Sequence, residues 1–176
     1  MADSTRFAMS FYSVVPLNST SISDVELEVL LRLVYVGGGF TEASIADSLF
    51  RAASVRARGE VIVAHDSAGT LLGAVVVVPF GSPARRFARP GEVELHLLCV
   101  CPHTRGHGIG SALVDAAAGA ARTDGASRMI LWTQTSMTAA RRLYEKHGFE
   151  RVPALDFSRG ERCFLVFARR ISGLSI

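Results

Sequence analysis

The chain has 176 residues, of which 49% are hydrophobic and 20% are charged, and its 19 basic and 16 acidic side chains give a formal net charge of +3. This length and hydrophobic content fit one globular domain and exclude a disordered or fibrous chain. The small positive charge, with scattered arginines and no aromatic platform, gives no support for nucleic-acid binding.

No segment of the sequence resembles a membrane span or a secretory leader. The longest apolar run, residues 71–80, is about half the length of a membrane-spanning helix, which needs roughly 20 residues. The N-terminal residues include Asp3 and lack the continuous apolar core of a signal peptide. We therefore expect a cytoplasmic protein that has no membrane partner.

The N-terminal half of the chain predicts a strand, two helices and a β-hairpin. Apolar and β-branched runs between turn residues indicate strands, and apolar residues at helical spacing indicate helices. These elements are expected over residues 7–15 (strand), from Ser23 to the glycines at 37–39 (helix), 41–58 (helix), 61–65 (strand) and 71–78 (strand). We interpret the three glycines as a flexible joint at the border of a substrate cleft.

The C-terminal half continues with alternating strands and helices. A loop over residues 79–91 carries Arg85, Arg86 and Arg89, and a solvated connection is favoured there over an anion-recognising lid. The later elements are expected over residues 92–100 (strand), 111–122 (helix), 128–133 (strand), 138–146 (helix), and near 150–152 and 162–168 (strands). The order β-αα-βββ-α-β-α-ββ predicts a single domain of the α/β or α+β class.

The most informative segment is a glycine-rich turn between a strand and a helix, Arg105-Gly-His-Gly-Ile-Gly110. Several backbone N–H groups converge at such a helix start, and the helix dipole adds to their attraction for an anion. The turn is neither a Walker loop nor the dinucleotide fingerprint, because no Gly-Lys-Ser/Thr follows and the third glycine of the fingerprint would fall on Ser111. By itself, the pattern indicates an anion-binding turn.

Two motifs together resemble the GNAT superfamily of N-acetyltransferases. The turn is similar to the family's acyl-CoA motif, Arg/Gln-x-x-Gly-x-Gly/Ala, and it follows the usual lead-in Leu98-x-Val100-x-Pro102. Downstream, the segment Ala140-Arg-Arg-Leu-Tyr-Glu-Lys-His-Gly-Phe149 resembles the second family signature, Ala-x-x-Leu-Tyr-x-x-x-Gly-Phe. The resemblance covers residues 60–169 by motif and strand order.

The resemblance implies a single acetyltransferase domain over residues 1–176, with acetyl-CoA as co-substrate. Its mixed central sheet would have six or seven strands, flanked by about four helices. The sheet would splay open between the strand that ends at Val100 and the strand that ends near Thr133. The implied cofactor-binding residues are Leu98, Cys99, Val100, Arg105, Gly106, His107, Gly108, Ile109, Gly110, Ser111, Ala140 and Tyr144.

Acyl transfer to an amine needs a base, because a free alkyl amine with a pKa of about 10.4 is mostly protonated at neutral pH. If no bulge intervenes, strand alternation places Glu92, Glu94, His96, Leu98 and Val100 on one face. The family resemblance implies a base eleven positions before Arg105, which is Glu94. Glu94 is therefore the first candidate, His96 the second and Glu92 the third. The alternative is that these residues are ordinary polar side chains at the sheet rim.

The second motif supplies a candidate general acid for the CoA thiolate. Tyr144 occupies the tyrosine position that the family uses for this role, although an aromatic residue on this helix could also be structural. The donor to the thioester carbonyl is expected to be the backbone N–H near Val100. Met137 stands where many family members have Asn and cannot hydrogen-bond the cofactor, so contacts from residues 133–138 are left open.

Two other catalytic designs are disfavoured. Alternation places Cys99 opposite to Glu94, which argues against a cysteine nucleophile. His103 and His107 have no third partner for a metal, and the cysteines, including Cys101 and Cys163, fit neither a disulfide framework nor a zinc ribbon. No metal is therefore expected.

The favoured function is direct acetyl transfer to a primary amine of a small molecule or peptide. The alternative is a non-catalytic acyl-CoA-binding or sensing module with the same fold. The sequence identifies no acceptor and leaves open whether the chain is a monomer or a homodimer.

Overall fold

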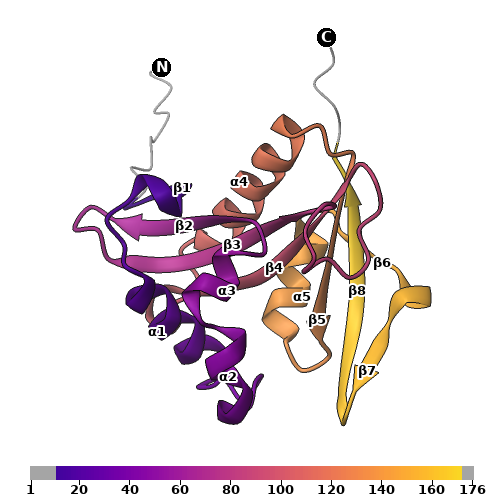
Figure 1. Cartoon of the computed structure of the whole chain (residues 1–176), viewed down its shortest axis with the longest axis horizontal. Helices are drawn as coiled ribbons and strands as arrows, with labels where there is room; N and C mark the ends of the chain where they lie inside the picture. Colours follow the sequence, from indigo (N-terminus) through magenta and orange to yellow (C-terminus); the bar gives the residue numbers. More distant parts are fainter. Residues whose placement is uncertain (1–10, 172–176) are drawn as a thin grey trace, which may run out of the picture.

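The computed structural model describes residues 11–171, which form a mixed eight-stranded sheet with helices on both faces (Figure 1). The strand order is β1-β2-β3-β4-β5-β8-β6, with β7 paired to β8, and β4 and β5 run parallel to each other. The strands are β1 (Tyr12–Pro16), β2 (Glu60–Asp66), β3 (Leu71–Pro79), β4 (Glu92–Val100), β5 (Arg128–Gln134), β6 (Glu150–Arg151), β7 (Phe157–Arg159) and β8 (Arg162–Arg170). The α-helices are α1 (Asp24–Tyr35), α2 (Ala43–Leu49), α3 (Ala52–Arg56), α4 (Ile109–Thr123) and α5 (Thr138–Lys146).

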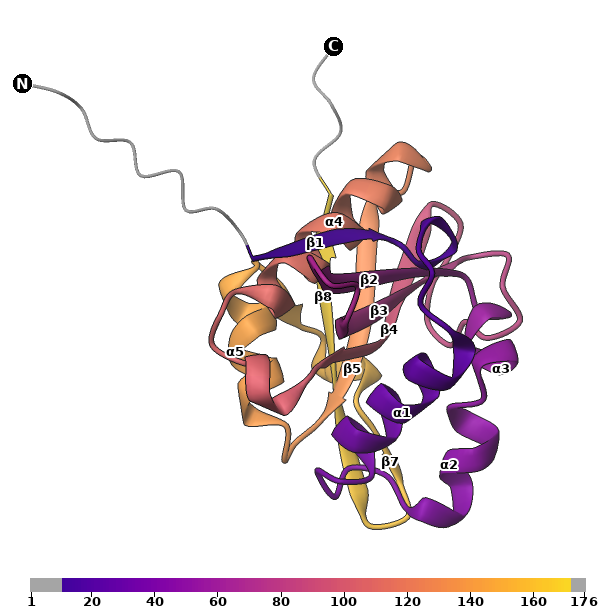
Figure 2. The same ribbon diagram turned by 90° about the vertical axis from the view of Figure 1, so that its left-hand side faces the viewer.

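Two hydrophobic cores cover the two faces of the sheet. Figure 2 shows α4 and α5 on one side of the strands and the three N-terminal helices on the other. Strand β3 contributes to both cores: Leu72, Val75 and Val77 pack with the α4 residues, whereas Ala74 and Val76 pack with residues of α1 and α3. This double burial explains why its sequence is a continuous apolar run instead of an alternating one.

The predicted mixed α/β fold is confirmed, with one more helix and one more strand in the described residues than expected. The predicted helix over 41–58 is two helices, because the backbone leaves helical geometry at Phe50 and Arg51, and the Phe50 side chain fills the core with 1% exposure. The added strand β7 has only three residues, which is too short for a periodic pattern. Residues 7–10 of the predicted first strand lie outside the described part of the chain.

The predicted flexible joint after α1 is a defined, hydrogen-bonded turn. The N–H groups of Gly37 and Gly38 donate to the carbonyls of Arg32 and Val34 at 3.1 and 3.2 Å. A Cβ added at Gly37 would lie 2.4 Å from the Leu33 carbonyl oxygen, so a side chain there would block this path. The backbone conformation of this turn therefore requires glycine at position 37.

None of the helices in the part of the chain described here has both the length and the apolar character required to cross a lipid bilayer.

Candidate active site

The central sheet opens where the parallel strands β4 and β5 separate. Their pairing extends from Glu92 opposite Arg128 to Leu95 opposite Leu131 and ends there. Two residues further along β4, Leu97 has a φ of 54°, in the left-handed region, and the register with β3 shifts at this level. This β-bulge bends β4 away from β5. The predicted opening near Val100 is present in the structure.

The bulge also changes which side chains share a face of β4. Leu98 and Val100 pack on the α4 side of the sheet, whereas Cys99 packs in the core beneath α1. Val93 and Leu95 lie on the α4 side, so Glu94 and His96 face the opposite side, together with Cys99. The predicted single face for Glu92, Glu94, His96, Leu98 and Val100 is therefore wrong, and so is the placement of Cys99 opposite to Glu94. Both predictions failed because alternation reverses at a bulge.

The glycine-rich turn forms an open cradle at the start of α4. Gly106 and Gly108 have φ values of 83° and 81°, and Gly108 is the N-cap of the helix. The helix begins at Ile109, two residues before the predicted start. The first turn of an α-helix has N–H groups without intrahelical acceptors, and here they belong to Ile109, Gly110 and Ser111. These donors are available for an anion.

A cavity of about 600 Å³ extends from this cradle to the α1–α2 turn. It is lined by ten of the predicted cofactor residues: Leu98, Cys99, Val100, Arg105, Gly106, Gly108, Ile109, Gly110, Ser111 and Ala140. His107 and Tyr144 are not part of its lining. The cavity is also lined by residues that were not among the predicted cofactor-binding residues: Val34, Phe40, Thr104, Ser136, Met137, Thr138, Ala139, Leu143 and Lys146. Met137 is thus at the cavity, although it lacks the amide of the family motif.

Glu94 is the most completely bonded side chain near the opening. It is 0% exposed, and its carboxylate accepts hydrogen bonds from the backbone N–H groups of Arg86, Phe87 and Ala88 and from His96 Nε2 at 2.8 Å. Desolvation raises the pKa of this carboxyl, but the hydrogen bonds from His96 and the three N–H groups outweigh it, so the pKa lies below its usual range. Glu94 is therefore an ionised anchor for the 79–91 loop.

The bond to Glu94 fixes the orientation of His96. Because a carboxylate can only accept, Nε2 carries the proton, and the neutral ring has its lone pair at Nδ1. The ring is 7% exposed and stands at an angle of 70° to Trp132, with 4.6 Å between ring centroids. His96 thus presents an oriented proton acceptor beside an aromatic wall.

Glu92, the third candidate base, is engaged elsewhere. It pairs with Arg128 at 3.0 Å and accepts the Arg89 N–H at 2.9 Å. It is the first residue of β4, whereas the strands separate after Leu95. Its contacts brace the start of the strand.

Burial sets the ionisation of the two other reactive groups near the opening. The Tyr144 ring packs against Phe149 and Phe167, and burial, with a smaller effect of the neighbouring Cys99, raises the pKa of its hydroxyl well above the usual value. Burial also raises the pKa of the Cys99 thiol to about 12. Cys99 therefore remains a protonated thiol at neutral pH, which disfavours it as a nucleophile even though it shares a face with Glu94.

The sequence did not reveal two polar groups at the opening. The Thr133 hydroxyl oxygen is buried and has no hydrogen-bond partner among residues 11–171. The Tyr35 hydroxyl donates to the Leu98 carbonyl at 2.9 Å. Thr133 comes two residues after Leu131, the last β5 residue paired with β4, although it still pairs with Leu165 of β8. Its position near the end of β5 was therefore a usable signal. Tyr35 has no comparable signal, since it meets β4 only through the tertiary fold.

The described residues contain no group of three side chains suited to hold a metal ion. His107 Nδ1 lies within hydrogen-bond distance of the backbone carbonyls of Thr104 and Arg105.

The buried Glu94 predicts a specific loss of stability in acid. Its pKa is lowered by folding, so its contribution to stability is present above the unfolded value of about 4.3 and is lost as the pH falls through the folded value. We expect Glu94→Gln to be less stable than the parent at pH 7 and to lose less stability between pH 6 and pH 3. Thermal melts across this range test it, with the exposed Glu60→Gln as control; parallel curves for the parent and Glu94→Gln would contradict it.

Comparison with known families and structures gives a consistent result. The model of the acetyltransferase (GNAT) family matches residues 29–149, which is more than half of the chain. An uncharacterized N-acetyltransferase of Schizosaccharomyces pombe is 38% identical over 92 residues. That match spans 52% of this chain and 52% of the relative, so the chain covers about half the length of this curated relative.

Solved structures share the fold at low sequence identity. A putative acyl-CoA N-acyltransferase of Klebsiella pneumoniae has a TM-score of 0.68 and 16% identity, over 93% of this chain and 99% of that one. A Bacillus subtilis acetyltransferase, solved in complex with CoA, has a TM-score of 0.63 and 22% identity, over 92% and 99%. These similarities concern the fold alone.

Proposed function

Since the chain belongs to the acetyltransferase (GNAT) family, we propose that it transfers an acetyl group from acetyl-CoA to a primary amine by direct attack of the amine. The observation that carries this proposal is the cavity of about 600 Å³ that joins the cradle at α4 to the split between β4 and β5. The structural relative from Bacillus subtilis was solved with CoA, which supports the choice of co-substrate. An amine acceptor follows from the family and from the oriented base beside the split.

Three features of this chain fit an acyl-CoA ligand. The N–H groups of the first turn of α4 are suited to its pyrophosphate, and Gly106 and Gly108 allow close approach of the backbone. The arm of the ligand would follow the gap-facing edge of β4. The buried Thr133 hydroxyl, which lacks a partner in the described residues, could be satisfied by that arm. The shape, the charge and the hydrogen-bonding capacity of the site therefore all suit an acyl-CoA ligand.

The backbone of Val100 is the proposed donor to the thioester carbonyl. The Cys101 N–H donates to Leu72 on β3 at 2.7 Å, and N–H groups alternate in direction along a strand. The Val100 N–H therefore points away from β3, into the gap. The Arg105 Nε group approaches the Val100 carbonyl at 3.4 Å and holds this segment.

His96 is the proposed base, and Glu94 is its positioning residue. Both Glu94 oxygens already accept hydrogen bonds, so its carboxylate is poorly placed to take a proton from an amine directly. The His96 Nδ1 lone pair accepts that proton, and Glu94 stabilises the imidazolium that results. The sequence favoured Glu94 as the base and placed His96 second. The present proposal exchanges these two roles and assigns both residues to the site.

Tyr144 is the proposed proton donor to the CoA thiolate. Burial raises the pKa of its hydroxyl, so the group keeps its proton until a strong acceptor forms nearby. A thiolate that develops at a buried position is such an acceptor, because it lacks solvation by water. Tyr144 does not line the cavity as it stands, so this role requires the sulfur end of the ligand to reach the core beside Cys99.

The function is tested by acetyl-CoA binding and by amine-dependent release of CoA. We expect a thermal upshift with acetyl-CoA and turnover with some primary amines. Tyr144→Phe should lower kcat about tenfold with little change in acetyl-CoA affinity, because only the proton donor is removed. The control is Thr123→Val, which removes an exposed hydroxyl at the C-terminal end of α4, away from the cradle at its start.

Each outcome of this test is informative. Binding without turnover with any amine would favour the non-catalytic acyl-CoA-binding module. The absence of any upshift would contradict the acyl-CoA assignment itself. An unchanged kcat in Tyr144→Phe would remove this residue from the mechanism.

A further inference from the structure

Three segments that are far apart in the sequence are linked on the face of the sheet that carries His96, opposite to α4 and α5. They are the loop 79–91, the β7–β8 hairpin and the α1–α2 turn over residues 35–42, and we call them together the acceptor ring. The cofactor cradle lies on the α4 side of the sheet, whereas these three segments lie on the other side of the split between β4 and β5.

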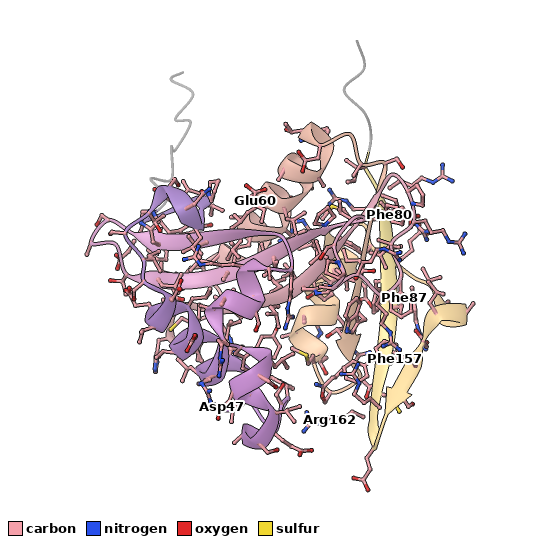
Figure 3. The ribbon with its side chains drawn as sticks, viewed as in Figure 1. Asp47, Glu60, Phe80, Phe87, Phe157 and Arg162 are labelled. Atoms are coloured by element: carbon pink, nitrogen blue, oxygen red, sulfur yellow. The ribbon has the colours of Figure 1, made fainter. Side chains whose placement is uncertain are left out.

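The loop and the hairpin are joined by an arginine and aromatic rings. Backbone N–H bonds to Glu94 hold the loop at Arg86 and Phe87. The Arg86 guanidinium then stacks over the Phe157 ring, 3.9 Å from its centroid, and the Phe87 ring packs edge-on against Trp132 with centroids 5.6 Å apart. Figure 3 shows Phe87 and Phe157 on the same side of the molecule, over β8. This contact closes one side of the ring.

The hairpin and the α1–α2 turn are joined at the Phe40 carbonyl and at Glu42. The Phe40 carbonyl accepts hydrogen bonds from Gln134 Nε2 at 2.6 Å and from Arg162 Nη1. Arg162 also lies 3.9 Å from the Glu42 carboxylate. In Figure 3, Arg162 occupies the space between α2 and the lower end of β8. Two donors from two strands thus hold one backbone atom of the turn.

The third junction connects the turn to β4. The Tyr35 hydroxyl donates to the Leu98 carbonyl at 2.9 Å, directly after the bulge. Tyr35 and Phe40 therefore tie the two ends of one short turn to the two strands that separate, β4 and β5. Phe40 and Val34 also line the cavity at the end away from the cradle. Together with the bonds from the 79–91 loop to Glu94, these contacts link the three segments and β4 in one continuous series.

On the basis of the proposed function, we propose that the acceptor ring selects small-molecule primary amines and excludes peptide chains, with Arg162 as the residue that sets this limit. A peptide that presents its N-terminal amine to His96 needs a groove wide enough for a whole backbone, and neighbouring extended chains lie about 4.8 Å apart. The Arg86–Phe157 and Arg162–Phe40 contacts instead join the hairpin to the 79–91 loop and to the α1–α2 turn, and so leave no gap between these segments at the two junctions. A slim aminoalkyl group needs no such groove.

The test compares acceptors of different width. The full chain is assayed with acetyl-CoA and benzylamine, free lysine, or a ten-residue peptide that has a free N-terminus and no lysine. We expect the parent to use at least one small amine with a kcat/KM about 100-fold above that for the peptide. Arg162→Ala should raise relative peptide use at least tenfold, because the Phe40 carbonyl loses one of its two donors.

Matched variants separate the ring from general effects of charge and folding. Arg159→Ala removes the same charge from the same hairpin, where Arg159 is exposed and lies opposite Arg162, and it should leave the acceptor ratio unchanged. Arg162→Lys keeps a donor for the carbonyl and should restore most of the selectivity. Thermal melts show whether each variant is folded. Gln134→Ala removes the other hydrogen bond to the Phe40 carbonyl and should change the acceptor ratio in the same direction as Arg162→Ala.

The outcomes distinguish this inference from the proposed function. Equal use of peptide and small amines by the parent overturns the inference and leaves the acetyltransferase function intact. An unchanged ratio in both Arg162→Ala and Gln134→Ala also overturns it. Turnover with none of the acceptors, in a protein that binds acetyl-CoA, contradicts the proposed function and the inference together.

Discussion

Gly108→Glu is expected to weaken binding of acetyl-CoA at least 100-fold, which corresponds to about 2.7 kcal/mol. Gly108 is the N-cap of α4, has a φ of 81° and stands among the N–H groups proposed to hold the pyrophosphate. A glutamate there places a negative charge against a negative ligand, and its Cβ would lie 3.4 Å from the Tyr12 hydroxyl. Titration calorimetry with acetyl-CoA measures the effect.

A second glycine provides the control for this variant. Gly69, in the turn between β2 and β3, has a φ of 86° and has open space around the position of a Cβ. Gly69→Glu thus introduces the same backbone strain and the same charge away from the cavity, and it should leave the affinity for acetyl-CoA unchanged. Similar losses in both variants would show that strain, and not the cradle, determines binding.

Features encoded by neighbouring residues could be predicted from the sequence. The cradle is local, because the alternating glycines, the preceding strand and the following helix lie within one short segment. Helix α5 was predicted with its observed bounds, Thr138–Lys146, because its motif, its apolar spacing and the glycine after it all agree. An element can be predicted from the sequence when its local signals agree in this way.

Features that depend on distant partners could not be predicted. No glycine marks the bulge, since the left-handed residue is Leu97, and the surrounding fold holds it in this conformation. Glu94 was predicted as the base, but its saturation by N–H groups follows from the course of the 79–91 loop. The bond between Arg162 and Phe40 joins positions 122 residues apart, and neither residue belongs to a motif.

The same limit explains why we propose His96 as the base, whereas the sequence favoured Glu94. The family pattern gives one position on β4, and that position is Glu94. Whether the carboxylate is free or enclosed depends on a neighbouring loop that the pattern does not describe. In this chain the loop encloses it and leaves His96 as the group with an open acceptor nitrogen.

His96→Gln is expected to lower kcat by about 10²- to 10³-fold, within the range typical of a lost general base. The glutamine amide can still donate a hydrogen bond to Glu94, so the variant tests the Nδ1 lone pair more than the packing. Acetyl-CoA affinity should be nearly unchanged, because His96 faces away from the α4 side of the sheet. Stopped-flow measurement of CoA release, with titration calorimetry for binding, separates the two effects.

The pH–rate profile then distinguishes the base from its positioning residue. In Glu94→Gln we expect kcat to fall at least tenfold while an acid limb remains, because His96 keeps its imidazole but loses the carboxylate that orients it through Nε2. In His96→Gln the acid limb should disappear, since no imidazole remains to be protonated. If Glu94 is itself the base, the result is the reverse: His96→Gln keeps an acid limb and most of its rate, while Glu94→Gln loses both.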